Sequence, residues 1–144
     1  MRHSLAAVAT AHNDGHPVRH PFLAPMKIVE MARFVDDVPK ATVFYRALLG
    51  TEPSYCDSSL ATFDVGGMTV LVHQRYEAGP GDLPCEDHIA FGVDDVDQAV
   101  AALERQGLKV EHPPRDYDWG RSAYLREPAG SLVEITQHST VGHI

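Results

Sequence analysis

The stretch Val35-Asp36-Asp37-Val38 occurs a second time in the chain as Val93-Asp94-Asp95-Val96. Each copy follows an apolar run and precedes a helical pattern, which is typical of a strand, a turn with an acidic helix cap, and a helix. The same displacement along the chain superimposes Glu30 on His88, and both are polar residues near the start of an apolar run. A polar pair placed by the repeat itself indicates a metal or ligand site as well as a fold.

The residues around each copy predict the same succession of elements: a strand, a helix and three further strands. In the first copy Pro39 suits the first helical turn and Gly50 ends the helix, whereas in the second copy Asp95 caps the helix and Gly107 ends it. The predicted strands are 26–35, 52–55, 59–65 and 68–73 in the first half, and 88–93, 108–111, 121–126 and 131–136 in the second. The helix residues expected to face the core are Ala41, Phe44, Tyr45 and Leu48, and then Ala99, Ala102 and Leu103.

Two such units predict an α+β fold of two βαβββ repeats that form similar sheets. A unit of roughly 50 residues is too small to cover its own concave sheet face. Two units can pair and leave a cavity between them, so the sheets are expected to be cupped around a shared site. The predicted boundaries are a first repeat at 26–77, a second repeat at 86–138, and a single domain at 26–144 that contains both.

Residues 1–25 have no sustained hydrophobic period and are interpreted as an extension before the domain. Two interpretations stay open for this segment. It is either a histidine-rich metal-binding tail or subunit-clasping arm, or a leader that is disordered or lies on the surface of the domain. Its histidines are His3, His12, His16 and His20.

Composition excludes several classes of function. The net charge of −8 argues against nucleic-acid binding, which needs a concentrated basic face. No apolar run approaches the ~20 residues that span a bilayer, so no membrane association is expected. Cys56 and Cys85 do not form a disulfide framework or a Cys-x-x-Cys metal motif, and they favour a reducing, cytoplasmic setting.

Three stretches carry a resemblance to a known family. They are Ala41-Thr-Val-Phe-Tyr-Arg-Ala-Leu-Leu-Gly50, Asp87-His-Ile-Ala-Phe-Gly-Val93 and Glu127-Pro-Ala-Gly-Ser-Leu-Val-Glu134. In this order the chain resembles the vicinal oxygen chelate superfamily, which includes glyoxalase I, bleomycin-resistance proteins and extradiol dioxygenases. The resemblance implies the paired βαβββ fold and a homodimer, but it does not fix the activity, because this scaffold carries many chemistries.

The resemblance also implies a set of metal ligands. The family's first-strand positions fall on Glu30 and His88, and its last-strand position in the second repeat falls on Glu134. The remaining position falls on Leu71, where glyoxalase I carries a glutamate and where this chain has no ligand. His73 points to the same strand face as Leu71 and is a possible substitute if the strand slides or bulges. Without His73, the site has three ligands.

Such a site suits Ni²⁺, Co²⁺, Mn²⁺, Fe²⁺ or Zn²⁺. The metal would stabilise an oxyanion or enediolate as a Lewis acid, and Glu134 or Glu30 would act as the base. The alternatives are an ion pair between Glu30 and a pocket arginine, and a hydrogen-bonded core position for His88.

Near the predicted site, Trp119 and Tyr124 are expected to line the substrate pocket together with Leu71. Arg126 is expected either to hold an anionic group of the substrate or to pair at the surface with Glu127 or Asp118. The sequence therefore predicts a metal-dependent, glyoxalase-like enzyme of lyase or isomerase type that acts on a small oxygen-rich substrate. The alternative is a metal-free protein of the bleomycin-resistance type that sequesters a drug or metabolite, and Leu71 favours this alternative.

Overall fold

The structure, a computed structural model, describes residues 26–138, which form two successive β-α-β-β-β units. The first unit contains β1 (Lys27–Val35), α1 (Val38–Leu49), β2 (Tyr55–Cys56), β3 (Leu60–Val65) and β4 (Met68–Gln74). The second contains β5 (His88–Gly92), α2 (Val96–Arg105), β6 (Val110–Tyr117), β7 (Gly120–Arg126) and β8 (Leu132–His138). The predicted order of elements is confirmed, while the predicted extension at 1–25 lies outside the described residues.

The repeated Asp-Asp pair caps both helices in the same way. Asp37 accepts a hydrogen bond from the backbone N–H of Lys40 at 2.9 Å, and Asp95 accepts one from the N–H of Gln98 at 3.0 Å. Each bond satisfies a donor that a helix N-terminus otherwise leaves unpaired. At the other end of α1, Gly50 takes a φ of 66°, a left-handed conformation that glycine adopts without strain.

Replacing either capping aspartate with alanine is expected to lower the free energy of unfolding by about 1 kcal/mol, because one helix donor loses its partner. Thermal or urea unfolding of Asp37→Ala and Asp95→Ala measures the effect. Asp94→Ala is the matched control, since Asp94 is an exposed neighbour outside the cap, and its change should stay within ~0.5 kcal/mol. Equal losses in the capping variants and the control would contradict the assignment.

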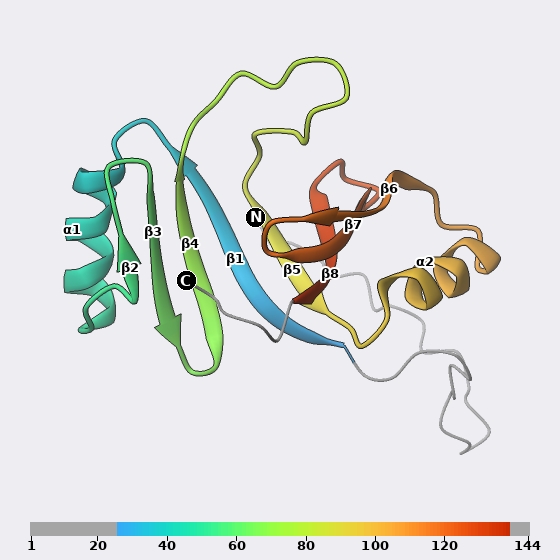
Figure 1. The fold of residues 1–144 in the computed structure, drawn as a ribbon, viewed down its shortest axis with the longest axis horizontal. Helices are drawn as coiled ribbons and strands as arrows, with labels where there is room; N and C mark the ends of the chain where they lie inside the picture. Colours follow the sequence, from blue (N-terminus) through green and yellow to red (C-terminus); the bar gives the residue numbers. More distant parts are fainter. Residues whose placement is uncertain (1–25, 139–144) are drawn as a thin grey trace, which may run out of the picture.

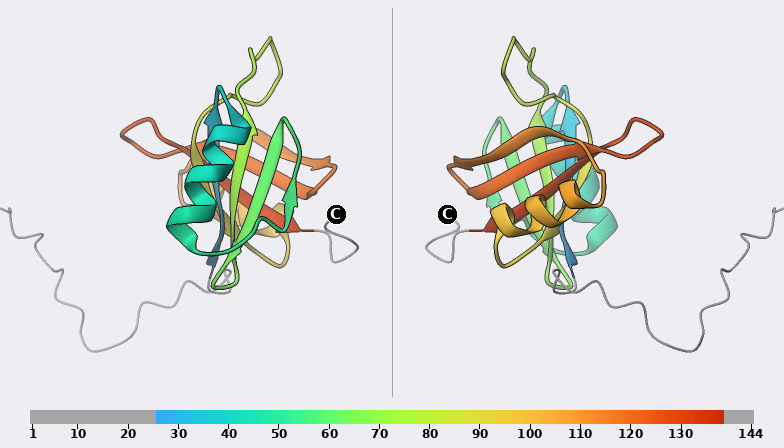
Figure 2. Two further views of the ribbon diagram at one scale, coloured as in Figure 1. Left: turned by 90° about the vertical axis from the view of Figure 1, so that its left-hand side faces the viewer. Right: turned by 90° about the vertical axis from the view of Figure 1, so that its right-hand side faces the viewer.

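The strands form one sheet in the order β2-β3-β4-β1-β5-β8-β7-β6. The two sheets expected from the sequence are therefore joined edge to edge, because β1 pairs in parallel with β4 and antiparallel with β5. Helices α1 and α2 lie at opposite ends of the molecule, each outside the strands of its own unit (Figures 1 and 2). None of the helices within 26–138 is long and apolar enough to cross a bilayer.

Each helix packs on the outer face of its half of the sheet and closes a separate apolar core. The first core contains Val38 of α1 with buried β3 and β4 side chains such as Phe63 and Val72, and Met31 and Val35 pack against it. The second half holds buried clusters built around α2, β7 and β8. Side chains alternate along a strand, so Ala32 and Phe34 of β1 point away from this core. They lie on the opposite, inner face of the sheet.

The predicted inner face of α1 was partly wrong. Phe44 and Leu48 are exposed at 58% and 64%, whereas Val38 and Thr42 are buried. The apolar residues of α1 cover more than one stripe of the helix, so their spacing alone does not fix which stripe meets the sheet. In α2 the prediction is confirmed, since Ala99 and Ala102 are both buried.

Candidate metal centre

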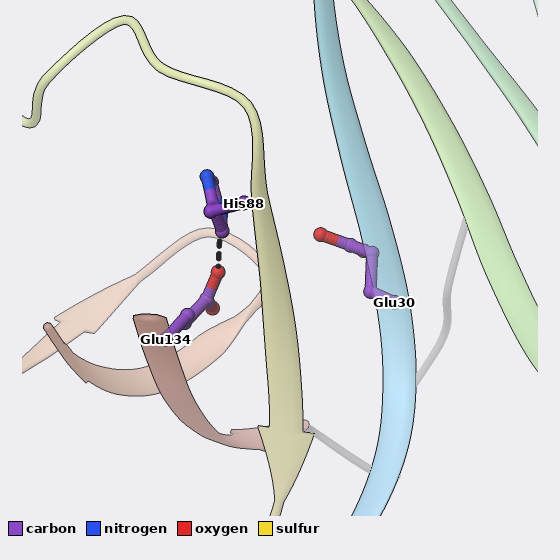
Figure 3. Close-up of side chains that lie close together, drawn as sticks. All are labelled: Glu30, His88 and Glu134. Carbon is purple, nitrogen blue, oxygen red and sulfur yellow. Dashed lines mark hydrogen bonds and ion pairs between the residues drawn. The ribbon is translucent and has the colours of Figure 1, made fainter. Parts of the chain in front are cut away.

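Glu30, His88 and Glu134 come together on the inner face of the sheet. One ligand atom from each lies within 4.8 Å of the other two, and Figure 3 shows Glu30 pointing from β1 toward the pair on β5 and β8. The strand register explains the grouping: Ala32 pairs with His88, while Ala90 pairs with both Glu30 and Glu134. The two halves of one chain therefore contribute to one site.

His88 is held by hydrogen bonds at both ring nitrogens. Its Nδ1 lies 2.8 Å from the carbonyl oxygen of Glu86, which only accepts, so Nδ1 carries a hydrogen. Its Nε2 lies 3.0 Å from Oε1 of Glu134. Burial opposes protonation of the ring, but the hydrogen bonds with Glu134 and Glu86 and the nearby negative charges outweigh it and raise the pKa of His88. The position between Nε2 and Oε1 therefore attracts positive charge.

Glu134 is 3% exposed and is fixed from its other side. The hydroxyl of Ser122 donates to its Oε2 at 2.9 Å, and the indole N–H of Trp119 donates to the Ser122 oxygen at 3.1 Å. Tyr124 lies beside this carboxylate, and burial together with the charge of Glu134 raises the pKa of its phenol. The orientation of Glu134 is thus set by groups outside the three-residue cluster.

Glu30 differs from Glu134 because its carboxylate forms no hydrogen bond or ion pair within residues 26–138. Burial, followed by the charge of Glu134, raises the pKa of Glu30 to about 7, while His88 acts in the opposite direction. The ion pair with a pocket arginine that the sequence left open is not formed. Two carboxylates and one imidazole with converging ligand atoms are a donor set that suits a divalent cation, which would relieve this unpaired charge.

The fourth family position falls where the sequence placed it. Leu71 pairs with Ala32 on β1 in the same way as Glu134 pairs with Ala90 on β5, so the two positions are equivalent in the repeats. His73 pairs instead with Phe34, and the β1–β4 register runs without a bulge from Glu30 to Val35. The structure therefore does not bring His73 to the cluster, because the slide or bulge that this required is absent from the pairing.

A family model described as the Glyoxalase/Bleomycin resistance protein/Dioxygenase superfamily matches residues 27–135. The chain belongs to this superfamily. The match covers both repeats and all three members of the cluster, which confirms the family resemblance drawn from the sequence. A curated relative, the uncharacterized protein YraH of Bacillus subtilis (strain 168), is 29% identical over 76% of this chain and 97% of its own length.

Solved structures show the same superfamily fold. The hypothetical protein BH1468 from Bacillus halodurans C-125 aligns over 84% of this chain and 100% of its own, with a TM-score of 0.67 and 15% identity. A protein from Legionella pneumophila titled NAD-dependent benzaldehyde dehydrogenase aligns over 76% and 98%, with a TM-score of 0.64 and 20% identity. A methylmalonyl-CoA epimerase variant from Streptomyces coelicolor aligns over 81% and 100%, with a TM-score of 0.58 and 22% identity. At these identities the likeness shows the fold alone.

The predicted pocket residues of this superfamily member lie in different surroundings. Tyr124 is 2% exposed, and its ring centroid lies 5.8 Å from that of His88. Trp119 is 38% exposed and stacks on Tyr117 with 4.6 Å between ring centroids. Both rings are on the inner side near the cluster, whereas the aliphatic Leu71 occupies the position equivalent to Glu134. The inner face around the cluster therefore carries aromatic rings and an aliphatic side chain, together with the hydroxyl groups of Ser122 and Thr136.

Arg126 is paired, but not with the partners named from the sequence. Its guanidinium forms a two-pronged ion pair with Glu86 at 2.7 and 2.9 Å and also contacts Glu111. These hydrogen bonds lower the pKa of the Glu86 carboxyl. Because the carbonyl oxygen of Glu86 orients His88, the pair anchors the segment that positions this histidine. A contact between Arg126 and a substrate anion stays a prediction.

Sequence reasoning gave no role to Ser122. One signal could have indicated its role. Side chains alternate along β7, so Ser122 lies on the same face as Tyr124, which pairs with Glu134. It also gave no account of Arg33, which forms a 3.1 Å ion pair with Asp87 at the start of β5. Oδ1 of this aspartate accepts the backbone N–H of Phe34. The pair joins the two central strands beside His88.

A hollow of about 470 Å³ lies at one end of these strands, between the end of β1, the loop that joins the repeats and the turn before β8. Phe34, Arg75, Glu86 and Gly130 are among its lining residues, and the three clustered side chains are not. Phe34 lies between the two regions, since it lines the hollow and its ring centroid is 6.1 Å from that of His88.

Proposed function

We propose that this protein is a metal-dependent, glyoxalase-like enzyme of lyase or isomerase type that acts on a small oxygen-rich substrate. The observation that carries the proposal is the convergence of Glu30, His88 and Glu134, with ligand atoms within 4.8 Å of one another. A bound divalent metal would supply Lewis-acid polarisation of the substrate oxygens. Three protein ligands leave positions for these oxygens, and the donor set does not choose among Ni²⁺, Co²⁺, Mn²⁺, Fe²⁺ and Zn²⁺.

In this proposal Glu30 is the general base and Glu134 is a fixed ligand. Glu134 is held at one oxygen by Ser122 and at the other by His88, so it is poorly placed to swing toward a substrate. Glu30 has no such partner among residues 26–138, so it is the carboxylate that can turn from the metal toward a substrate proton. It would take a proton from a carbon next to a carbonyl group and return it to the neighbouring atom.

The side chains beside the cluster favour a substrate with apolar or aromatic parts. Tyr124 and Trp119 contribute rings, and Leu71 contributes an aliphatic side chain at the fourth position. Glu86 occupies the two terminal guanidinium nitrogens of Arg126, so a substrate anion would compete with an existing ion pair. We therefore place Tyr124 and Trp119 in the pocket ahead of Arg126.

The second candidate function is metal-free sequestration of a drug or metabolite. Leu71 favours it, because a ligand position of glyoxalase I is filled by a side chain that cannot bind a metal. In such a protein the proton between His88 and Glu134 would take the place of a cation. The two functions differ in whether a stoichiometric metal is present.

Metal content separates these functions. The full chain, purified without a histidine tag and with His3, His12, His16 and His20 replaced with glutamine, is compared with the same protein carrying Glu30→Ala. Elemental analysis is expected to find about one divalent metal per chain in the protein that keeps Glu30. The Glu30→Ala protein is expected to have lost this metal. An absence of metal after soaking in Ni²⁺, Mn²⁺ and Zn²⁺ would instead favour the sequestration protein. The predicted homodimer is measured on the same samples by sedimentation.

A further inference from the structure

We infer that Ser122 is a positioning residue that makes Glu134 a one-oxygen metal ligand and couples the metal centre to Trp119. The inference rests on the proposed metal site but concerns residues outside the ligand set. Ser122 lies on β7 and pairs across the sheet with Thr136, one row from the pair formed by Tyr124 and Glu134. Its side chain is fully buried.

Counting hydrogens gives the direction of each bond around Ser122. The Trp119 indole nitrogen can only donate, so its 3.1 Å contact delivers a hydrogen to the Ser122 oxygen. The ionised Glu134 carboxylate can only accept, so the single hydroxyl hydrogen of Ser122 goes to Oε2. The Ser122 hydroxyl is also the donor toward the Thr136 hydroxyl oxygen at 2.8 Å, and the charged carboxylate is the stronger acceptor of its single hydrogen. The Ser122 oxygen thus links Trp119 directly to Glu134.

This arrangement divides the two oxygens of Glu134 between two tasks. Oε2 is occupied by Ser122, whereas Oε1 faces His88 Nε2 at 3.0 Å and is the oxygen on the side of the cluster. Without the serine hydroxyl, the carboxylate can rotate and offer both oxygens. A residue that fixes a ligand in this way contributes about 10–100-fold to metal affinity in characterised sites.

The row of hydrogen bonds from Glu134 through Ser122 ends at Trp119, whose fluorescence can report on the site. Trp119 is the only tryptophan of the protein, it is 38% exposed, and it donates directly to the Ser122 oxygen. A cation that draws electron density from Glu134 makes its Oε2 a weaker acceptor for the Ser122 hydrogen, and this changes the polarisation of the indole N–H in turn. Indole emission should therefore report metal binding, although Trp119 is not itself a ligand.

The experiment is a Zn²⁺ titration of the full chain with the four leader histidines replaced with glutamine. Zn²⁺ is chosen because it has no redox chemistry and a closed d shell, so an emission change reflects the hydrogen bonds. Affinity is measured by competition with a chelator, and Trp119 emission is recorded in parallel. Ser122→Ala, Ser122→Thr and Ser54→Ala are compared. Ser54 is the matched control, because its hydroxyl also lies 2.8 Å from a threonine hydroxyl, that of Thr62 on the far half of the sheet.

Ser122→Ala is expected to bind Zn²⁺ at least about tenfold more weakly and to lose the emission change even when saturated. Ser122→Thr should recover both, and Ser54→Ala should match the parent. If Ser122→Ala does not fold, the Zn²⁺ affinity of Trp119→Phe is measured instead. A loss of roughly threefold or more supports the coupling from Trp119 through Ser122 to Glu134, and a smaller loss or none overturns it. Equal Zn²⁺ affinity and equal emission change in the parent and Ser122→Ala overturn this inference alone. A parent that binds no Zn²⁺ overturns the proposed function as well.

Discussion

Replacing Glu30 with glutamine is expected to abolish tight metal binding and, at the same time, to stabilise the metal-free protein above pH 7. The loss of affinity should exceed the about 10–100-fold cost of removing a residue that only supports a ligand, because Glu30 is itself one of three proposed ligands. The gain in stability follows from its environment. Glu30 is a carboxylate without a hydrogen-bonding partner among residues 26–138, and glutamine keeps its shape without its charge.

The sign and the pH range follow from the pKa. Burial and the charge of Glu134 raise the pKa of Glu30 from 4.5 to about 7 in the folded protein, so between these values the folded chain holds a proton that the unfolded chain has released. The free energy of unfolding of the metal-free protein therefore falls as pH rises through this range, by about 3 kcal/mol from this group. Glu30→Gln removes the fall and should be more stable by this amount at pH 8, with little difference near pH 4.5.

Urea unfolding in the presence of a chelator at pH 5 and at pH 8 measures this effect. Glu127→Gln provides the control, since Glu127 is an exposed glutamate whose charge is not in the cluster, and it should change the pH dependence by less than ~0.5 kcal/mol. If Glu30→Gln were less stable than the parent at pH 8, the Glu30 carboxylate would have a stabilising partner in the protein. This result would contradict its role as an unpaired carboxylate that a metal can bind.

Replacing Leu71 with glutamate is expected to tighten metal binding by roughly the 10–100-fold scale on which metal sites respond to nearby groups. Leu71 and Glu134 occupy equivalent positions in the two repeats, because Leu71 pairs with Ala32 on β1 as Glu134 pairs with Ala90 on β5. Leu71 therefore lies beside Glu30 in the same way that Glu134 lies beside His88. A carboxylate at this position would complete a four-ligand set. It would also occupy a coordination position that the substrate is proposed to use, so turnover should fall while affinity rises.

Chelator competition with Zn²⁺ or Mn²⁺ measures this gain, and Leu71→Met keeps the size and polarity of the side chain as a control that should leave affinity unchanged. The metal-free form of Leu71→Glu should be less stable than the parent, because a third carboxylate joins two that already repel each other. Unchanged affinity in a folded Leu71→Glu protein would place this side chain away from the cluster and would contradict the equivalence of the two positions.

The internal repeat was enough to predict the fold because it carries two independent signals. The Asp-Asp pair marked the starts of both helices, and the recurrence of the same succession of apolar runs and turns marked the two units. The choice of stripe on α1 failed at Phe44 and Leu48, since both possible stripes are apolar and only the packed sheet selects one. The joining of the two sheets through β1 and β5 was also missed, because strand edges have no distinct sequence pattern.

For the candidate site, the sequence placed the three clustered residues but not their surroundings. Glu30 and His88 were predicted to lie together because they occupy the same position in the repeat, and their proximity agrees with this. The role of Ser122 was not found, because it depends on pairing between β7 and β8, and the register of two strands is a tertiary property. The partners of Arg126 were wrong for the same reason: Glu86 lies 40 residues away in the chain and reaches the arginine only through the fold.

The separate apolar cores have a consequence for how the molecule unfolds. Each helix is packed against its own half of the sheet, and the line between the halves consists mainly of β1–β5 backbone pairing and the polar cluster. Met26, just before β1, packs against the core of the second half, so the first strand belongs to both. A cation bound at Glu30, His88 and Glu134 would add a link between the two halves through ligands from both, so its binding would stabilise the two halves together.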